Sequence, residues 1–300
     1  MSGARVRTAF AAALAVGALA LTAACGSAGV PTPDAVVRHG TLDRALHDRL
    51  PLSVQDAGVL RVGTDASYAP MSMFGPDGRT VVGMEPDLAA EIGRVLGVRL
   101  ELVDTDFDSL LDDVASGRLD LAMSAVTDTA DRARTVDFVD YFSAGTAMVV
   151  QRGNPSGISD LRDLCGRAVA VERATIQVDL LRRAQHHCGH QPIDVRTYPT
   201  NSDALLQLRT GRVASVLNDL PPAVYLTTDR RTRQDYQLAT TTQYEPGLYG
   251  IAVSQDQPAL RDALRTAVQR LVRDGVYLDV LGRWHVRSGA IRQVTVDLDQ

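Results

Sequence analysis

From Val59 onward, short apolar segments alternate along the chain with amphipathic ones. Short apolar runs between turn residues are typical of strands, whereas Leu88, Ile92 and Leu96, spaced four apart, indicate one buried face of a helix. We expect strands at 59–64, 98–103, 119–126, 146–151, 167–171, 193–197 and 213–218. We expect helices at 86–96, 109–116, 175–186, 203–210, 258–273 and 277–284. Strands that alternate with helices predict an α/β fold.

A weak internal repeat favours two similar lobes. Residues 109–124 align with residues 203–218, and each stretch reads as a helix, a Gly-Arg turn and a buried strand that ends in Ser124 or Asn218. A generic helix–turn–strand unit can produce the same likeness by chance. In open α/β sheets, however, ligands bind beyond the carboxyl ends of the strands. Both copies therefore place a hydrogen-bonding side chain where a ligand would bind.

A candidate anion site follows the third expected strand. Thr129 can cap a short helix there, which leaves backbone N–H groups, the Thr127 hydroxyl and the Arg132 guanidinium around one point. A guanidinium fork matches a carboxylate in a bidentate way. The alternative is a surface arginine that pairs with Asp128 or Asp131.

The second half of the chain offers complementary groups. Thr175 opens an expected helix, so its hydroxyl and the first free amides are available to an anion. Asp219 ends a strand, and a carboxylate across a cleft from an arginine suits the ammonium and carboxylate of an amino acid. Tyr68 and Phe107 can pack on the apolar part of such a ligand. The alternatives are a turn residue for Asp219, because Pro221 follows it, and an ordinary core position for each aromatic residue.

Composition and motifs exclude several classes of enzyme. All 31 basic residues are arginine, the chain has no lysine, and the formal net charge is −5. Schiff-base and P-loop chemistry are therefore excluded, and the lack of a basic run argues against nucleic-acid binding. The sequence contains no G-x-S-x-G or H-E-x-x-H motif, and none of its 6 histidines falls at an expected strand end. We expect no catalytic residues, no cofactor and no metal.

The first 24 residues read as a signal peptide. Two arginines precede an uncharged stretch at 8–24, and the segment Leu21-Thr22-Ala23-Ala24-Cys25 resembles a lipobox. Cys25 would then become the lipidated first residue of a mature chain with a net charge of 29 − 36 = −7. The alternative is plain secretion with an unmodified Cys25; a single membrane anchor is disfavoured because no basic cluster follows. Residues 26–40 read as a polar tether.

Two further cysteines, Cys165 and Cys188, fit an exported protein. An even pair outside the cytoplasm favours a disulfide, here between the start of a strand and the end of the helix that follows it. Three neighbouring histidines could be metal ligands, but Gly189 breaks the helix and no acidic ligand is adjacent. We therefore favour a solvated helix end for His186, His187 and His190.

In their order and spacing, several segments resemble family 3 of the solute-binding proteins, the polar amino acid receptors of ABC importers. The segments are 59–70, 83–88, 117–121, 127–132 with Asp137 and Phe138, 169–177, 206–219, 249–253 and 274–277. The resemblance covers about residues 55–286. It implies a two-lobed periplasmic-binding-protein fold of type II, with two crossover hinge strands near 141–147 and 244–251.

The resemblance and the N-terminal pattern together imply a discontinuous lobe 1 and an inserted lobe 2. Residues 1–24 would be the signal peptide, 25–54 the lipidated cysteine and tether, 55–143 and 248–287 lobe 1, 144–247 lobe 2, and 288–300 a C-terminal tail. The tail lies outside the resemblance, and the helices before it would return to lobe 1.

The resemblance also implies roles for the candidate residues. Arg132 would bind the ligand α-carboxylate, helped by the Thr127 hydroxyl and the backbone at Thr175. Asp219 would bind the α-ammonium, and Tyr68 would cover the side chain. The full set of expected ligand-binding residues is Asp65, Tyr68, Phe107, Ser124, Thr127, Arg132, Glu172, Thr175 and Asp219.

Asp65 and Glu172 lie where the family reads the ligand side chain. Two acids there suit a cationic or amide-bearing side chain, although either acid could instead pair with Arg173. The chain departs from the family pattern at Ala174, where glycine is usual, and at Ile176, where a small or hydroxyl residue is common. Both departures leave less space for the backbone of a ligand to approach this turn.

These expectations describe an exported, monomeric binding protein that is lipid-anchored to the outer face of the cell membrane. It would capture a polar amino acid and deliver it to an ABC permease. One alternative is an exported cyclohexadienyl dehydratase-like lyase on the same fold, with Glu172 as general acid or base. The other is a sensor that presents its ligand to a receptor kinase.

Overall fold

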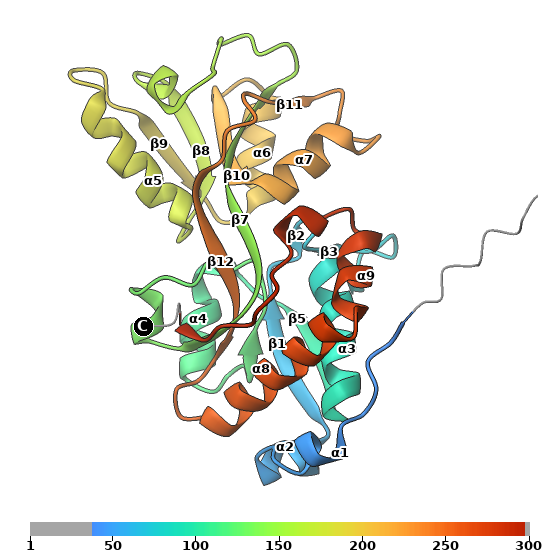
Figure 1. The fold of residues 1–300 in the computed structure, drawn as a ribbon. Coiled ribbons are helices and arrows are strands. Elements are labelled where there is room, and N and C mark those ends of the chain that lie inside the picture. Colours follow the sequence, from blue (N-terminus) through green and yellow to red (C-terminus); the bar gives the residue numbers. More distant parts are fainter. Residues whose placement is uncertain (1–37, 298–300) are drawn as a thin grey trace, which may run out of the picture. The chain divides into compact units, whose positions relative to one another are not determined.

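The computed structural model describes residues 38–297 (Figure 1). The predicted signal peptide, Cys25 and most of the predicted tether lie outside the described residues. Of the helices between residues 38 and 297, none is both long and apolar enough to cross a membrane.

Nine strands within residues 38–297 form one sheet. They are β1 (Val59–Thr64), β5 (Arg99–Asp104), β6 (Leu121–Ala122), β7 (Asp137–Gln151), β8 (Ala168–Glu172), β9 (Asp194–Tyr198), β10 (Ser215–Asp219), β11 (Tyr236–Leu238) and β12 (Tyr244–Val253). Their order is β5-β1-β6-β12-β7-β10-β8-β9, and β11 pairs with β7 outside this path. β1 is parallel to β5 and β6, and β8 is parallel to β9 and β10. The strands of each parallel set therefore end at the same edge of the sheet.

β7 and β12 connect the two halves of the sheet (Figure 1). They pair in antiparallel fashion, from Asp137 opposite Val253 to Thr146 opposite Tyr244. On one side of this pair, β5, β1 and β6 form the sheet of lobe 1; on the other side, β10, β8 and β9 form that of lobe 2. This arrangement confirms the expected two-lobed α/β fold with two crossover strands.

Helices cover both faces of the lobe 1 sheet. They are α3 (Met84–Leu96), α4 (Leu110–Ala115), α8 (Pro258–Arg273) and α9 (Val276–Arg283). α3, α8 and α9 share one core cluster, which includes Ile92 and Leu264, whereas α4 contributes Val114 to a second cluster. Because neighbouring residues of a strand point to opposite faces, Leu121 of β6 joins the first cluster and Ala122 the second.

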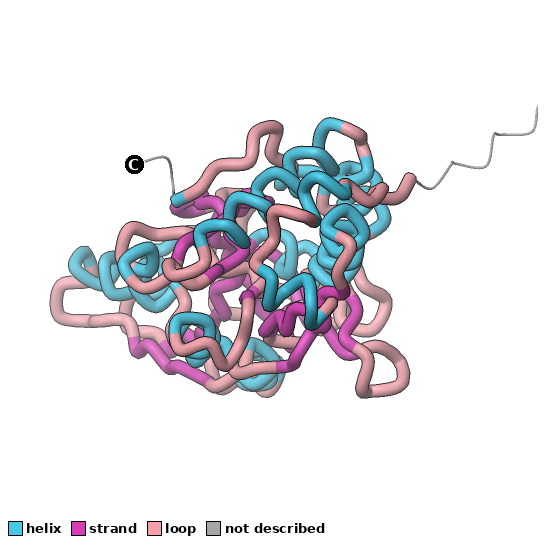
Figure 2. The backbone as a smooth tube through the Cα atoms, turned by 90° about the horizontal axis from the view of Figure 1, so that it is seen from below, coloured by secondary structure: helices cyan, strands magenta, loops and turns pink. Residues whose placement is uncertain are grey.

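The lobe 2 sheet is also covered on both faces. Figure 2 shows the whole described chain from below, with strands near the middle and helices around them. The helices are α5 (Ile176–Ala184), α6 (Asn201–Arg209) and α7 (Leu220–Thr228). α6 and α7 share a cluster that includes Ala204 and Ala223, while α5 contributes Leu181 to the cluster on the other face. Ala170 of β8 belongs to the first of these clusters and Val169 to the second, so β8 is buried on both sides.

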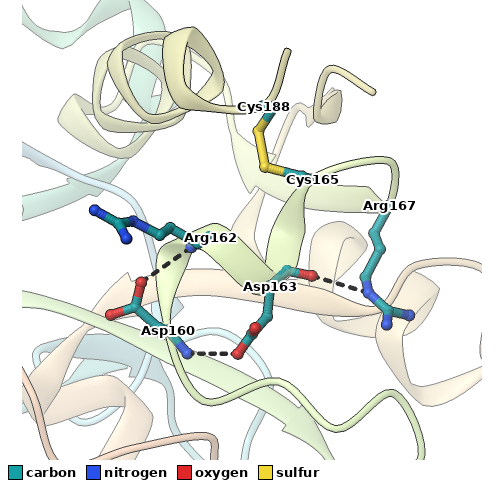
Figure 3. The surroundings of a disulfide bond; sticks show 6 residues. All are labelled: Asp160, Arg162, Asp163, Cys165, Arg167 and Cys188. Atoms are coloured by element: carbon teal, nitrogen blue, oxygen red, sulfur yellow. Dashed lines mark hydrogen bonds between the residues drawn. A yellow bond between two sulfur atoms is a disulfide. The ribbon is translucent and has the colours of Figure 1, made fainter. Parts of the chain in front are cut away.

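A disulfide joins Cys165 and Cys188 in lobe 2, as the sequence predicts (Figure 3). Cys165 precedes β8 and Cys188 lies beyond the end of α5, so the bridge closes this strand–helix unit. The three histidines around Cys188 are on this segment. Across residues 38–297, no group of three or more histidine, cysteine or acidic side chains is placed to hold a metal ion.

A small second sheet in lobe 1 has no counterpart in the sequence-based expectations. It consists of β2 (Ser67–Tyr68), β3 (Ser72–Phe74) and β4 (Val81–Val82). Between β4 and α3, Gly83 has φ +149, and a Cβ atom there would lie 2.1 Å from the carbonyl oxygen of Met71. Only glycine fits this close approach of two backbone segments.

The segment before β1 differs from the expected tether, which was to extend to residue 54. Residues of this segment form α1 (Arg44–His47) and the start of α2 (Leu52–Ala57), and Leu46 and Leu50 are buried in the lobe 1 core. His47 Nδ1 lies 2.8 Å from the carbonyl oxygen of Leu96 at the end of α3. The two leucines bury apolar side chains, which a solvated tether would leave exposed. The folded part of the chain therefore begins before residue 54.

The expected C-terminal tail is likewise part of lobe 1 as far as it is described. Val294 is 5% exposed, and Val296 forms an antiparallel bridge with Val139 of β7. The Asp140 amide donates to Thr295 O at 3.0 Å. These contacts pair the tail with the first half of β7, so the tail is a structural element of this lobe.

Candidate ligand-binding site

One cavity lies where the carboxyl ends of strands from both lobes meet. Asp65 and Ser124 follow β1 and β6 in lobe 1, while Glu172 and Asp219 end β8 and β10 in lobe 2. The space that the centre of a water-sized sphere can reach in this cavity is about 20 Å³, so the walls lie close together. Its walls are formed by Asp65, Tyr68, Phe107, Ser124, Ala125, Thr127, Arg132, Glu172, Thr175, Ile176, Gln177 and Asp219. All nine residues expected to bind ligand are in this set, so the structure brings them together.

Arg132 provides the positive charge of the cavity. It begins η2 (Arg132–Arg134), and its guanidinium donates to Thr127 O and to Ala174 O, each at 2.8 Å. Burial lowers the pKa of this guanidinium, and the charge of Asp219 opposes that effect. The alternative of a surface pair with Asp131 does not hold, because Asp131 pairs with Arg134.

The residues around Arg132 hold it in the cavity wall. The Arg132 guanidinium carbon lies 5.8 Å from the centre of the Phe107 ring, within the range of a cation–π contact. The Arg132 amide donates to Thr129 Oγ1 at 3.3 Å, as expected of a cap, although η2 is a single turn of 3₁₀ helix. Thr127 is buried, and its backbone is bridged to Tyr249 of β12.

Thr175 occupies the N-cap position of α5, but its hydroxyl does not cap the helix. The hydroxyl instead donates to Glu172 O at 2.7 Å. In this structure a backbone carbonyl thus takes the proton of this hydroxyl, and its role toward an anion stays a prediction. The backbone at the start of α5 remains part of the cavity wall through Thr175 and Ile176.

Asp219 provides a negative charge from lobe 2. Its carboxylate accepts from Tyr68 Oη at 2.9 Å and from Gln177 Nε2 at 2.8 Å. Burial raises the pKa of Asp219 to about 6, although its hydrogen bonds and the charge of Arg132 act in the opposite direction. Because Tyr68 belongs to lobe 1, its bond with Asp219 crosses from one lobe to the other.

Asp65 and Glu172 face the cavity from different lobes and are 5% and 6% exposed. Asp65 Oδ1 accepts from the Ser67 amide at 2.7 Å, and the Asp65 amide donates to Ser124 Oγ at 2.9 Å. Burial, followed by a hydrogen bond with Asp65 and its charge, raises the pKa of Glu172 to about 10. The alternative pairing of these acids with Arg173 is not observed, since Arg173 forms an ion pair with Asp108 at 2.6 Å.

A buried acid that sequence reasoning missed supports the loop after β6. Glu85, in the first turn of α3, accepts from the Ala125 amide at 2.6 Å and from Ser72 Oγ at 2.8 Å. Tyr141 of β7 donates to the same carboxylate. Burial raises the pKa of Glu85. Ala125 lines the cavity with φ +49, so Glu85 holds a backbone turn in place rather than facing a ligand itself.

The turn before α5 contains Ala174, one of the two positions where the sequence departs from the pattern that it resembles. Ala174 has φ +60, a backbone conformation that favours glycine. Its carbonyl accepts from Arg132, so the strained turn lies in the contact between the lobes.

Gln177, two residues into α5, was also missed as a cavity residue. Its place on the first turn of a helix that opens at the cavity is the signal that could have found it.

A sheet crossed by two long strands, with a polar cavity between its two lobes, defines a two-lobed binding protein. The chain belongs to the bacterial extracellular solute-binding proteins, family 3, whose sequence pattern matches residues 60–287. Its fold and its cavity thus agree with the family that the sequence resembles.

Named relatives are amino-acid-binding proteins rather than enzymes. The arginine-binding protein ArgT of Corynebacterium glutamicum is 27% identical over 254 residues, which cover 83% of this chain and 81% of that protein. The L-cystine-binding protein TcyJ of Escherichia coli K12 is 29% identical over 232 residues, or 77% of this chain and 84% of that protein.

Solved structures show the same relationship. An ancestral arginine-binding protein bound to glutamine has a TM-score of 0.70 and 30% identity over 76% of this chain and 98% of its own. The ancestral amino acid-binding protein AncCDT-1, a precursor of cyclohexadienyl dehydratase, has a TM-score of 0.69 and 27% identity over 77% of this chain and 97% of its own.

Proposed function

We propose that the protein captures a free amino acid with a cationic or amide-bearing side chain and delivers it to an ABC permease. The observation that carries this proposal is the placement of Arg132 and Asp219 on different lobes, both lining one buried cavity. A free amino acid offers a carboxylate and an ammonium on one carbon. Groups of opposite charge on the two lobes allow such a ligand to bind to both lobes at once.

The carboxylate of the ligand would bind at Arg132. A guanidinium has five N–H donors, and the two contacts with Thr127 O and Ala174 O leave donors for a ligand. A bidentate bond between a guanidinium and a carboxylate is among the stronger polar contacts in proteins. Thr127, which also lines the cavity, would add its hydroxyl.

The ammonium of the ligand would bind at Asp219. With a pKa of about 6, this carboxyl is mostly ionised at neutral pH. A cation beside a buried carboxylate favours its charged form, so an ammonium would lower this pKa further. Tyr68 and Gln177 already hold the carboxylate in a fixed orientation through their hydrogen bonds.

The side chain of the ligand would extend toward Asp65 and Glu172. Two carboxyl groups at that end suit a guanidinium or ammonium, or an amide that donates hydrogen bonds. Relatives support this class of ligand, since ArgT is an arginine-binding protein and an ancestral arginine-binding protein is bound to glutamine. The family is extracellular, and we propose that this protein is a monomer held at the outer face of the membrane by a lipid on Cys25.

A thermal-shift screen of the purified protein against the twenty amino acids, prephenate and arogenate tests the proposal. A ligand that binds only the folded state increases the free energy of unfolding by RT ln(1 + [L]/Kd) and therefore raises the melting temperature. We expect stabilisation by arginine, lysine, glutamine or another member of the cationic and amide class. If only prephenate or arogenate stabilises the protein and is turned over, the lyase is the correct function. If none of these compounds acts, the cavity binds something else.

A further inference from the structure

Two buried carboxyl groups face each other across the lobes of the cavity. Asp65 follows β1 in lobe 1, and Glu172 ends β8 in lobe 2. Asp65 Oδ2 and Glu172 Oε1 are both buried, and neither accepts a hydrogen bond from an amide or hydroxyl donor anywhere in residues 38–297. Two ionised carboxylates cannot approach each other in such a site unless a positive charge lies between them.

The other groups that face Glu172 add negative charge. Besides Asp65, the carboxyls of Asp219 at the end of β10 and Asp108 in η1 (Phe107–Ser109) act on Glu172. Glu172 in turn acts on the Tyr68 hydroxyl of β2, which is neutral because burial raises its pKa well above its usual value. The carboxyl groups therefore come from three further elements, and all of them disfavour the ionised form of Glu172.

The nearby cations face other carboxyl groups. Arg173 forms its ion pair with Asp108 at 2.6 Å, and the charge of Arg132 acts on Asp219, Asp179 and Asp128. On β9, Tyr198 is the register partner of Glu172, and its side chain packs in the core of lobe 2. Burial and the nearby carboxyl of Asp65 raise the pKa of Glu172 to about 10, which agrees with a protonated Glu172 at neutral pH in the closed cavity.

We propose, on the basis of the amino-acid-binding function above, that Glu172 and Asp65 share one proton when the cavity closes around an uncharged side chain, and that a cationic side chain takes the place of this proton. The proton and the cationic group of the ligand would then be alternative occupants of the same position. The selectivity of the cavity between a neutral and a cationic ligand side chain therefore depends on pH.

The consequence for binding follows from linkage. In the open protein, solvated carboxyls are ionised above about pH 5. Closure around a neutral side chain then takes up about one proton, so its affinity falls about tenfold per pH unit, whereas closure around a cationic side chain takes up none. Titration of Asp219 affects both ligands equally, because both carry the same α-ammonium, and it cancels in the ratio of their affinities.

L-Arginine and L-citrulline are matched probes, because citrulline replaces the guanidinium by a neutral urea of nearly the same shape. Calorimetric titration of the full chain at pH 5.5, 6.5 and 7.5, each in two buffers that buffer at that pH and differ in ionisation enthalpy, gives both the affinity and the protons exchanged. We expect the dissociation constant of citrulline, divided by that of arginine, to rise about tenfold per pH unit, with citrulline taking up about one proton more than arginine on binding. Titration of Asp219, whose pKa is about 6, changes both dissociation constants by the same factor.

Two variants separate this mechanism from a merely structural role. Glu172→Gln keeps a neutral donor in place of the protonated acid, so the difference in pH dependence between citrulline and arginine should disappear while arginine binds at least tenfold more weakly. Glu101→Gln removes an exposed acid of β5 and should leave both ligands unchanged. Equal pH slopes for the two ligands in the unmodified protein, or a difference in slope that persists in Glu172→Gln, would overturn the shared proton. Absence of binding by arginine, citrulline and every other cationic or amide-bearing amino acid would instead overturn the ligand class proposed above.

Discussion

Arg132 combines, in one side chain, the charge and the geometry that a carboxylate needs. Its planar guanidinium joins the lobes through Thr127 O and Ala174 O and is covered on one face by Phe107. Because the chain contains no lysine, every permanently charged cation among its side chains is an arginine. Of these, Arg132 is in the wall of the cavity.

Replacement of Arg132 by alanine should therefore weaken ligand binding strongly. Loss of two charge-assisted hydrogen bonds is expected to reduce the binding free energy by about 3 kcal/mol, roughly a hundredfold in affinity. Isothermal titration calorimetry with the amino acid found in the thermal screen measures this loss. Arg134→Ala is the matched control, because Arg134 is 75% exposed and pairs with Asp131. Similar affinities for Arg132→Ala and the unmodified protein would remove Arg132 from the site.

At the residue scale, the sequence predicts which side chains meet but not how each is used. The nine candidate residues line one cavity because the carboxyl ends of neighbouring parallel strands converge. Their roles in binding stay predictions. Glu85 lies behind the cavity wall, and nothing in the local sequence points to its contact with the Ala125 amide. Gln177, by contrast, has a place in the first turn of α5 that could have indicated it. The Thr175 hydroxyl was assigned to an anion, yet it donates to a carbonyl three residues earlier in the chain.

At the scale of single elements, the disulfide ties the start of β8 to the segment beyond α5 (Figure 3). The bridged cysteines are 23 residues apart in the sequence. Closing a loop of this length restricts the unfolded chain by about 3 kcal/mol on the chain-entropy estimate. The bridge is at the end of α5 away from Thr175 and Gln177, so it should stabilise lobe 2 without touching the ligand.

The Cys165→Ser, Cys188→Ser double variant should thus lower the free energy of unfolding by about 3 kcal/mol and leave ligand affinity within about twofold. Urea unfolding followed by circular dichroism measures the first quantity, and calorimetry measures the second. Reduction of the unmodified protein is the control for the substitutions themselves. A large loss of affinity in a folded double variant would mean that the bridge positions the start of α5.

The sequence predicts elements with a strong apolar period, but it does not predict very short strands or terminal segments that pack on lobe 1 through distant contacts. The expected helix at 258–273 is α8 with the same bounds, since its apolar face repeats over four turns. β7 extends from Asp137 to Gln151, whereas the apolar pattern indicates a strand at 146–151 and the resemblance a crossover near 141–147. The buried acids Asp137 and Asp140 hide the start of this strand. Strands as short as β2 and β4 have no detectable period. Docking of α1 and of residues 290–296 depends on distant contacts that local patterns do not contain.

At the scale of the whole described chain, contacts across the cavity hold the lobes together. Tyr68 bonds to Asp219, Arg132 to Ala174 O, and Arg173 to Asp108. The lobes are also connected by β7 and β12 (Figure 1). Hinge closure of domains around a ligand is the established motion of periplasmic binding proteins. A ligand that bonds to both lobes would favour the closed arrangement over the open one.

Small-angle X-ray scattering should accordingly show a smaller radius of gyration for the protein saturated with ligand than for the free protein. Addition of the same ligand to Arg132→Ala should produce no change at a concentration that saturates the unmodified protein. If the radius stays constant while calorimetry reports full binding, the cavity is closed in both states and the lobes do not act as a hinge.

The cavity should bind both the carboxylate and the ammonium of one free amino acid. Calorimetric titration with the best ligand of the screen, its N-acetyl derivative and its carboxamide measures how far binding depends on each of these groups. We predict one site per chain for the free amino acid and at least a hundredfold weaker binding for each blocked form, because each removes a charge that Arg132 or Asp219 faces. Equal binding of the free and blocked forms would mean that the cavity recognises neither charge.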